Sequence, residues 1–247
     1  MHSIELDDGR RVPYSIRVSR RSRRVRLTID PRNGVVMVTP PGVDRQWLTE
    51  LAASWRGWVA TQIDQMGIGE LQPTTGDRVA LPDCIELAAL GERWEICYRY
   101  TPSAAARVRQ SGAGRLLLSG DCANHGACRR ALVRWLGRRA REVLPAWLEE
   151  VSAATGLPFS SVVIRAQRSR WGSCSAKGDI SLNYQLLFLP RELARHVLLH
   201  ELCHTVELNH SARFWRTVHR FEPELERMRK DMRRSWSHVP AWVNEAA

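Results

Sequence analysis

Five residues in the C-terminal quarter, His200-Glu201-Leu202-Cys203-His204, follow the spacing HExxH and restrict the fold more than any other segment. An apolar run from Val197 to Leu199 precedes them, and Pro190 suits the first turn of a helix, so a helix is predicted here. At 3.6 residues per turn, positions 200 and 204 lie about 40° apart around the helix axis. Both imidazole rings therefore project from one face and can bind a single metal ion.

A catalytic zinc site needs a third protein ligand and leaves one coordination position for water. His210 is the favoured donor, because it follows His204 by six residues and Asn209 can end the helix in a left-handed turn. Glu222 and Glu224 on the following helix are the alternative donors. We therefore expect one zinc ion (Zn2+) per chain, bound by three side chains.

Glu201 lies about 100° from His200 around the helix, which keeps its carboxylate close to the metal but not bound to it. Zinc lowers the pKa of its bound water toward about 7, and Glu201 can accept that proton and pass it to a leaving group. His196 shares the face of His200, but a fourth histidine ligand would close the site, so it is interpreted as a flanking residue. The motif predicts a hydrolase with Glu201 as its catalytic residue.

The order of predicted elements indicates an α+β fold with two regions. Residues 1–120 form a β-rich N-terminal region: hairpins are expected at 3–18 and 25–38, a helix at 44–66, and further short strands from 78 to 118. The tryptophans of that helix, Trp47, Trp55 and Trp58, are expected in the core. Residues 121–247 form the metal-binding catalytic region, with helices at 127–155, after Pro190 and at 212–234, the last interrupted at Pro223, and strands at 162–165 and 179–183.

The segment Arg170-Trp-Gly-Ser-Cys174 lies between the last two strands. Arg170 is a candidate for binding a substrate carboxylate or phosphate, and the Ser173 hydroxyl or nearby backbone amides for stabilising an oxyanion. The alternative is structural, with Trp171 and Gly172 shaping a tight bend against the metal helix.

Charge suggests partners. The formal net charge is +11, and every basic residue except Lys177 and Lys230 is arginine, which favours phosphates, carboxylates and nucleic acid as partners. The stretch from Arg17 to Arg26 is basic, and one face of the predicted helix 127–155 carries Arg130, Arg134, Arg138 and Arg141. These faces are either solvated surface or binding sites for a nucleotide or nucleic acid.

Six scattered cysteines without a CxxC pair indicate reduced thiols rather than disulfides, although Cys122 and Cys128 are spaced to pair or bind metal. The first residues lack a basic segment followed by an apolar run, so no secretory signal is expected. No stretch reaches the roughly 18 apolar residues of a membrane span. We expect a cytoplasmic protein that has no contact with a membrane.

Residues 169–215 resemble the YgjP-like (DUF45) metallopeptidase family, which is related to the SprT and WLM zincin-like proteins. The resemblance rests on the RWGSC segment, the strand ending at Leu182-Asn183, the HELxH helix and the NHSxxFW tail from Asn209 to Trp215. It implies a zincin-like core, zinc on His200, His204 and His210, and Glu201 as general base. The basic N-terminal strand and the VTPPG segment are also similar to that family, so the resemblance covers most of the chain.

Three functions fit these features. The first is a zinc metallopeptidase that cleaves peptide or protein substrates with an activated water. The second is a metal-dependent nucleotide phosphohydrolase (pyrophosphatase) on the same site, since a Lewis acid and a base do not dictate the substrate. The third is a nucleic-acid-binding module with a structural metal. The sequence predicts the site more closely than it predicts the substrate.

Overall fold

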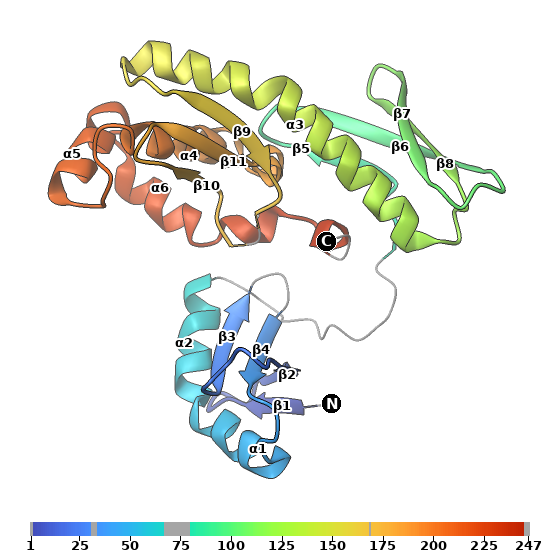
Figure 1. Ribbon diagram of the computed structural model, residues 1–247, viewed down its shortest axis with the longest axis vertical. Coiled ribbons are helices and arrows are strands. Elements are labelled where there is room, and N and C mark those ends of the chain that lie inside the picture. The colour runs from blue at the N-terminus through green and yellow to red at the C-terminus, as the bar shows by residue number, and fades with distance from the viewer. Residues whose placement is uncertain (1, 31–33, 67–79, 168, 245–247) are drawn as a thin grey trace. The chain divides into compact units, whose positions relative to one another are not determined.

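The computed structural model describes residues 2–30, 34–66, 80–167 and 169–244, which form two compact units, Met1–Arg78 and Val79–Ala247 (Figure 1). Both units combine helices with antiparallel and parallel strand pairs, so the predicted α+β class is confirmed. None of the helices in the described ranges is long and apolar enough to cross a membrane.

The first unit is a four-stranded sheet covered by two helices. Its sheet has the order β1-β2-β4-β3, with β1 (His2–Glu5), β2 (Arg11–Val18), β3 (Arg26–Asp30) and β4 (Gly34–Thr39). The predicted antiparallel pairs β1–β2 and β3–β4 are present, and a parallel pairing of β2 with β4 joins them. The inner face of this sheet supplies the apolar core of the unit, which includes Ile4, Tyr14 and Met37.

The predicted helix 44–66 is two helices, α1 (Arg45–Ser54) and α2 (Arg56–Met66), and Asp44 caps the first. The expectation that its tryptophans are core residues is wrong for two of them, since Trp47 is 48% exposed and Trp58 is 45% exposed, whereas the half-buried Trp55 packs against the core of this unit. The chain turns at Trp55, so the helical spacing of buried residues in α1 does not continue into α2. The buried positions are i and i+4 pairs of smaller residues, namely Leu48 with Ala52 in α1 and Val59 with Ile63 in α2.

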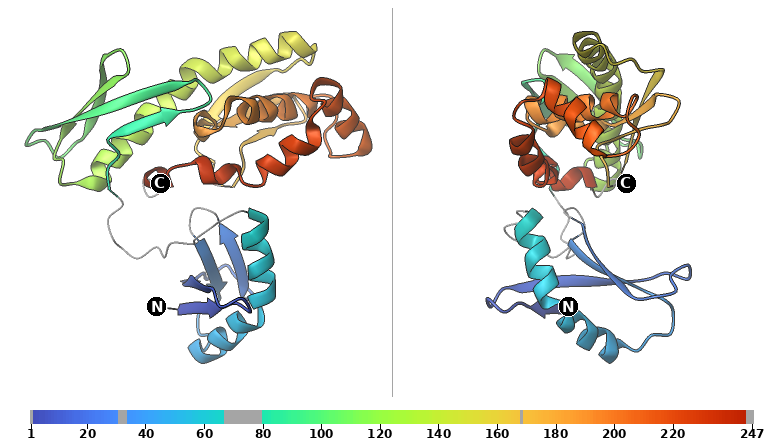
Figure 2. Two further views of the ribbon diagram at one scale, coloured as in Figure 1. Left: turned by 180° about the vertical axis from the view of Figure 1, so that it is seen from behind. Right: turned by 90° about the vertical axis from the view of Figure 1, so that its left-hand side faces the viewer.

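The second unit begins with a sheet of order β5-β6-β8-β7, made of β5 (Cys84–Leu87), β6 (Glu92–Tyr100), β7 (Arg107–Gly112) and β8 (Arg115–Gly120). The long helix α3 (His125–Thr155) follows; Asn124 caps its start, and Gly156 ends it in the left-handed conformation, with φ 71°. It remains helical through Pro145. Helix α3 packs against this sheet and also against the next one (Figure 2).

The next sheet has the order β10-β11-β9, with β9 (Ser161–Arg165), β10 (Gly172–Cys174) and β11 (Asp179–Asn183), so β10 is an edge strand. The remaining elements are helical: η1 (Tyr184–Phe188), α4 (Arg191–Cys203), α5 (Ala212–Phe221), α6 (Leu225–Met232), η2 (Ser235–His238) and α7 (Ala241–Asn244). The predicted helix 212–234 is interrupted next to Pro223, where α5 ends and α6 begins.

The compact units divide at Arg78, whereas the sequence suggested a division at residue 120. Strands β5–β8 share one apolar core with α3 and α4, and the rings of Trp94 and Trp135 meet edge to face at 5.3 Å. Backbone contacts add to this, because the Ala89 N–H donates to the Leu187 carbonyl at 3.2 Å. Strands 84–120 therefore belong to the unit that carries the HExxH helix.

All six cysteines are free thiols, as expected from their scattered positions. The Cys122 and Cys128 thiols donate to the backbone carbonyls of Gly120 and Asp121, both at 3.6 Å, and not to each other. In the parts of the chain that the structure describes, three histidines form the only group of side chains positioned to hold a metal ion.

Candidate metal centre

Helix α4 holds the HExxH residues in a rigid setting. Nine of its thirteen residues are buried, among them Leu198, Leu199 and Leu202, so the core fixes the helix along most of its circumference. Its last turn carries His200 and Glu201, and His204 is the residue at which the helix ends. His200, a candidate ligand, is one of the few residues of this helix that the core does not bury completely.

The three histidines converge through their Nε2 atoms. His204 Nε2 lies 3.2 Å from both His200 Nε2 and His210 Nε2, and the last two lie 3.0 Å apart. Three corners of a tetrahedron with zinc–nitrogen bonds of 2.0–2.1 Å lie roughly 3.3 Å apart, so the arrangement fits three ligands of one zinc ion. It leaves the fourth corner for a water or a substrate.

His210 reaches the other two rings through the short connection between α4 and α5. The helix does not end in the left-handed turn expected at Asn209, since no non-glycine residue described has a positive φ. It ends in a tight turn in which the Glu207 N–H donates to the Cys203 carbonyl at 3.0 Å. Ser211 then starts α5 by accepting from the Phe214 N–H, which leaves His210 between the two helices.

The alternative third donors have other partners. Glu222 lies 3.7 Å from the guanidinium of Arg195, and Glu224 forms an ion pair with Arg227 at 2.5 Å. Neither belongs to the group of candidate ligand atoms, which consists of the three histidines.

A backbone hydrogen bond sets the tautomer of one of the three candidate ligands. His204 Nδ1 lies 3.0 Å from the Glu207 carbonyl oxygen, which can only accept, so Nδ1 carries the proton. The Nε2 lone pair of His204 is therefore directed at the other two histidines. A ligating histidine whose second nitrogen donates to a carbonyl is the usual arrangement in metal sites.

Burial keeps the histidines in the neutral form that binds metals. Burial, followed by the neighbouring histidines His204 and His210, lowers the pKa of His200 to about 3. The pKa of His204 is lowered for the same first reason, against the opposing effect of its bond to Glu207. Burial, followed by the charge of Arg195, lowers the pKa of His196 to about 4.

The aromatic rings of Phe214 and Trp215 pack against the three histidines. Phe214 is fully buried and contacts all three rings, stacking on His204 at 4.4 Å and meeting His200 and His210 edge to face at 4.9 Å. Trp215 stacks on His210 at 5.6 Å. The spacing of charged residues gave no indication of these two positions; the only sequence signal was the FW pair in the NHSxxFW tail.

Glu201 is a buried carboxylate whose Oε2 atom has no hydrogen-bond partner among the described residues. Burial raises its pKa, the positive charge of Arg170 opposes this by a smaller amount, and the net pKa is about 8. A buried carboxylate without a partner is costly, and a cation on the adjacent histidines would offset that cost. This unpartnered oxygen therefore agrees with a metal beside Glu201.

Strand β10 lies directly against that carboxylate. A Cβ added at Gly172 would lie 2.6 Å from Glu201 Oε1, so the space between strand and helix admits only glycine. Trp171 is anchored by a hydrogen bond from Nε1 to Ser235 Oγ at 2.9 Å and by stacking on Trp236 at 3.8 Å. The structural interpretation of Trp171 and Gly172 agrees with these contacts.

Of the two predicted substrate-binding residues, Arg170 lines the pocket and Ser173 does not. Arg170 is exposed and lines the pocket beside Glu201. Ser173 is half-buried and is not among the pocket-lining residues. Because side chains alternate along a strand, Ser173 faces away from the side on which Gly172 meets Glu201. The structure therefore brings Arg170 to the site, but not the Ser173 hydroxyl.

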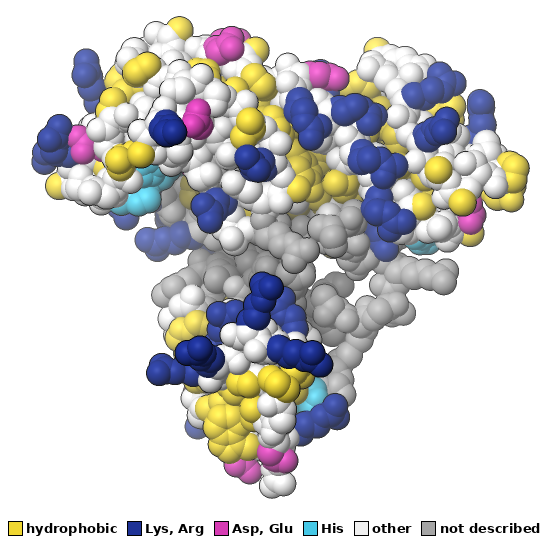
Figure 3. All heavy atoms as spheres, in the orientation of Figure 1, with side chains coloured by type: hydrophobic (Ala, Val, Ile, Leu, Met, Phe, Trp, Pro, Cys, Tyr) yellow, Lys and Arg dark blue, Asp and Glu magenta, His cyan; other side chains and the backbone are white. Residues whose placement is uncertain are grey.

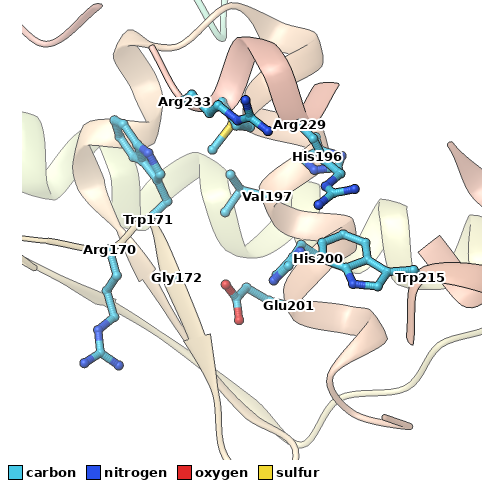
Figure 4. A pocket seen from close by; sticks show the side chains of 11 residues that line it. Arg170, Trp171, Gly172, His196, Val197, His200, Glu201, Trp215, Arg229 and Arg233 are labelled. Carbon is cyan, nitrogen blue, oxygen red and sulfur yellow. The ribbon is translucent and has the colours of Figure 1, made fainter. Parts of the chain in front are cut away.

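The pocket beside the histidines has a volume of about 350 Å³ (Figure 4). Its lining includes one carboxylate residue, Glu201, and three arginines, of which Arg170 directs its guanidinium group away from the other lining residues. Arg229 lies over the ring of Trp215 at 4.5 Å. The residues that line the pocket are Arg170, Trp171, Gly172, His196, Val197, His200, Glu201, Trp215, Arg229, Met232 and Arg233.

The chain matches a family of metallopeptidases and is similar to solved structures of metallopeptidase zymogens. The family model described as YgjP-like, metallopeptidase domain, matches residues 23–235. The metallopeptidase zymogen abylysin of Pyrococcus abyssi is 30% identical over 36% of this chain and 87% of its own, with a TM-score of 0.32. Jannalysin of Methanocaldococcus jannaschii, also a metallopeptidase zymogen, is 20% identical over 34% and 88%, with a TM-score of 0.31. No curated protein matches the chain.

Proposed function

The chain belongs to the YgjP-like metallopeptidase family, and we propose that it is a zinc-dependent peptidase in which His200, His204 and His210 hold one zinc ion. Glu201 is the catalytic base of this proposal. The observation that carries it is the convergence of three Nε2 atoms within 3.2 Å, beside a buried carboxylate oxygen that has no partner among the described residues.

A bound zinc ion supplies Lewis acidity, which lowers the pKa of water and polarises a carbonyl group. Glu201 accepts the proton of the attacking water and then donates it to the amide nitrogen that leaves. A cation on the histidines would favour the charged carboxylate that accepts the proton. Gly172 leaves room for the carboxylate in this position, since a Cβ there would overlap it.

The edge of β10 offers a place for the substrate backbone. Among the described residues β10 pairs only with β11, and Gly172 at its start lines the pocket. A peptide added as a further strand would gain main-chain hydrogen bonds while its scissile bond lies beside Glu201 and the histidines. Arg170, at the entry to this strand, is suited to bind an acidic group of the substrate.

A second candidate function is hydrolysis of a nucleotide phosphoanhydride. The observation that favours it is the presence of three arginines, Arg170, Arg229 and Arg233, among the lining residues, because a guanidinium group can bind phosphate as well as carboxylate. A metal with a purely structural role fits less well, because structural zinc sites normally have four protein ligands.

The test uses the zinc-loaded protein with two sets of substrates, a mixture of unstructured peptides and a panel of nucleoside triphosphates. We expect peptide cleavage that falls at least about 1000-fold in Glu201→Gln with zinc still bound. Glu192→Gln on the same helix is the matched control, because Glu192 is exposed and pairs with Arg227 outside the pocket. Phosphate release without peptide cleavage would favour the second candidate, and zinc binding without hydrolysis of either would reject both.

A further inference from the structure

A second groove lies in the unit Val79–Ala247, between α3 and the end of β9, with a volume of about 410 Å³. Four of its nine lining residues are arginines, Arg134, Arg138, Arg141 and Arg165, and none is acidic. The groove shares no lining residue with the pocket at the metal centre. It is therefore a positively charged cavity that the peptidase chemistry does not use.

The four arginines lie around the groove, and Gly137 leaves space between those of α3. Arg134, Arg138 and Arg141 follow each other at helical spacing along one face of α3, and the first and last lie about 10 Å apart along the axis. Gly137 lies between them without a side chain, and a Cβ there would meet only Arg141 Nη1, at 3.6 Å. Arg165 faces them from β9.

Two of the guanidinium groups are held in place by the backbone next to them. Arg134 Nη2 donates to the Ala106 carbonyl at 3.1 Å, and Arg138 Nη2 donates to the Val108 carbonyl at 3.2 Å. A guanidinium group has five N–H donors, so most donors of both side chains stay available. Anchored side chains lose less conformational entropy when a ligand binds.

The four groove arginines lack counter-charges. In the described parts of the chain no carboxylate forms an ion pair with any of them. Arg139, on the other side of the same helix, shows the contrast, since it pairs with Glu92 and Glu142. Four positive groups around one cavity repel each other, and an anion bound there would relieve that repulsion.

We propose that this groove binds the phosphodiester backbone of a nucleic-acid strand. Guanidinium groups bind phosphate oxygens in pairs of parallel hydrogen bonds, and here they extend over two helical turns, farther than one phosphate reaches. The charge also continues past the groove, with exposed Arg130 one turn before Arg134. Lys and Arg side chains gather over α3 and beside it on the face seen in Figure 3. A continuous strand can place successive phosphates along this row of arginines, whereas a free nucleotide is too short to contact all of them.

The test measures fluorescence anisotropy of a labelled 12-nucleotide single strand with the full-length, zinc-loaded protein. The informative variant is Arg141→Gln with Arg165→Gln, because neither side chain makes a hydrogen bond within the described structure. The matched control is Arg216→Gln with Arg220→Gln, which removes the same charge from exposed positions of α5. Melting temperature and zinc content are compared in all three proteins.

We expect the groove variant to raise the Kd at least about tenfold and the control variant less than about twofold. The slope of log K against log salt should fall by about 1.4 in the groove variant, since each phosphate contact to a single strand contributes about 0.7. Equal losses in both variants would overturn the proposal. It would also be overturned if the wild type bound polyglutamate or ATP through these arginines but did not bind the oligonucleotide.

Discussion

Gly172 and Glu201 are in contact across the gap between strand β10 and helix α4, so closely that a Cβ on Gly172 would lie 2.6 Å from Oε1 and 2.7 Å from Cγ of Glu201. The HExxH helix alone therefore does not determine where the base lies. A residue on a different element, nearly thirty positions earlier in the chain, limits the space that its carboxylate can occupy.

The first prediction concerns this contact. Gly172→Ala should displace the Glu201 carboxylate and lower kcat/KM by about 100-fold, because shifts near 1 Å cost about that factor. Zinc content should not change, since Gly172 contacts none of the three histidines. Gly137→Ala is the control, because its added Cβ makes only ordinary contact. Full activity of Gly172→Ala would show that Glu201 has room to adjust.

The second prediction concerns the stability of the metal-free protein. Burial raises the folded-state pKa of Glu201 to about 8, above its ordinary value of 4.5. The unfolded chain therefore releases this proton more readily, and stability should fall as pH rises from about 4.5 to about 8. Glu201→Gln removes this effect. Its melting temperature should exceed that of the wild type by at least about 3 °C at pH 8, and the difference should disappear at pH 4. A difference in melting temperature that stayed constant from pH 4 to pH 8 would contradict a raised pKa of Glu201 in the folded state.

The third prediction concerns Trp215, which stacks on His210, the most exposed of the three histidines. Trp215→Ala should loosen His210 and weaken zinc binding by about tenfold, the usual effect of removing a residue that supports a ligand. Competition with a chromogenic chelator measures this affinity. Trp47→Ala, at an exposed tryptophan of the first unit, should leave it unchanged.

The fourth prediction concerns Glu92, which joins β6 to α3. Burial raises its pKa, but hydrogen bonds from Arg139 and from Trp94 Nε1 outweigh that effect, so the net pKa is lowered. The folded state therefore favours the charged form, and this stabilisation is present above the ordinary pKa of 4.5 and lost as pH falls below it. The urea midpoint of the wild type should decline on acidification more steeply than that of Glu92→Gln. If both urea midpoints declined in parallel, the ion pair of Glu92 with Arg139 would contribute nothing to stability in this pH range.

Local periodicity explains what could be predicted from the sequence. Helical geometry alone predicts that His200 and His204 share a face, and the alternation and turn residues predict the pairs β1–β2 and β3–β4. The predicted burial of Trp47 and Trp58 is wrong because the chain turns at Trp55, and no periodicity shows that turn in advance.

Contacts between distant segments explain what could not be predicted. The fit of Gly172 against Glu201, the position of Phe214 behind all three histidines and the joining of strands 84–120 to α3 all depend on tertiary packing. His210 was the favoured third ligand because of its spacing, but the backbone path that brings it back is a tight turn and not the expected left-handed residue. Its role as a zinc ligand remains a prediction.

The most direct test of this account is elemental analysis of the purified protein beside two variants, His210→Ala and Glu224→Ala. We predict about one zinc ion per chain in the wild type and in Glu224→Ala, and a loss of most of it in His210→Ala. Zinc retained in His210→Ala but lost in Glu224→Ala, or no metal in a folded and zinc-supplemented wild type, would contradict the three-histidine site.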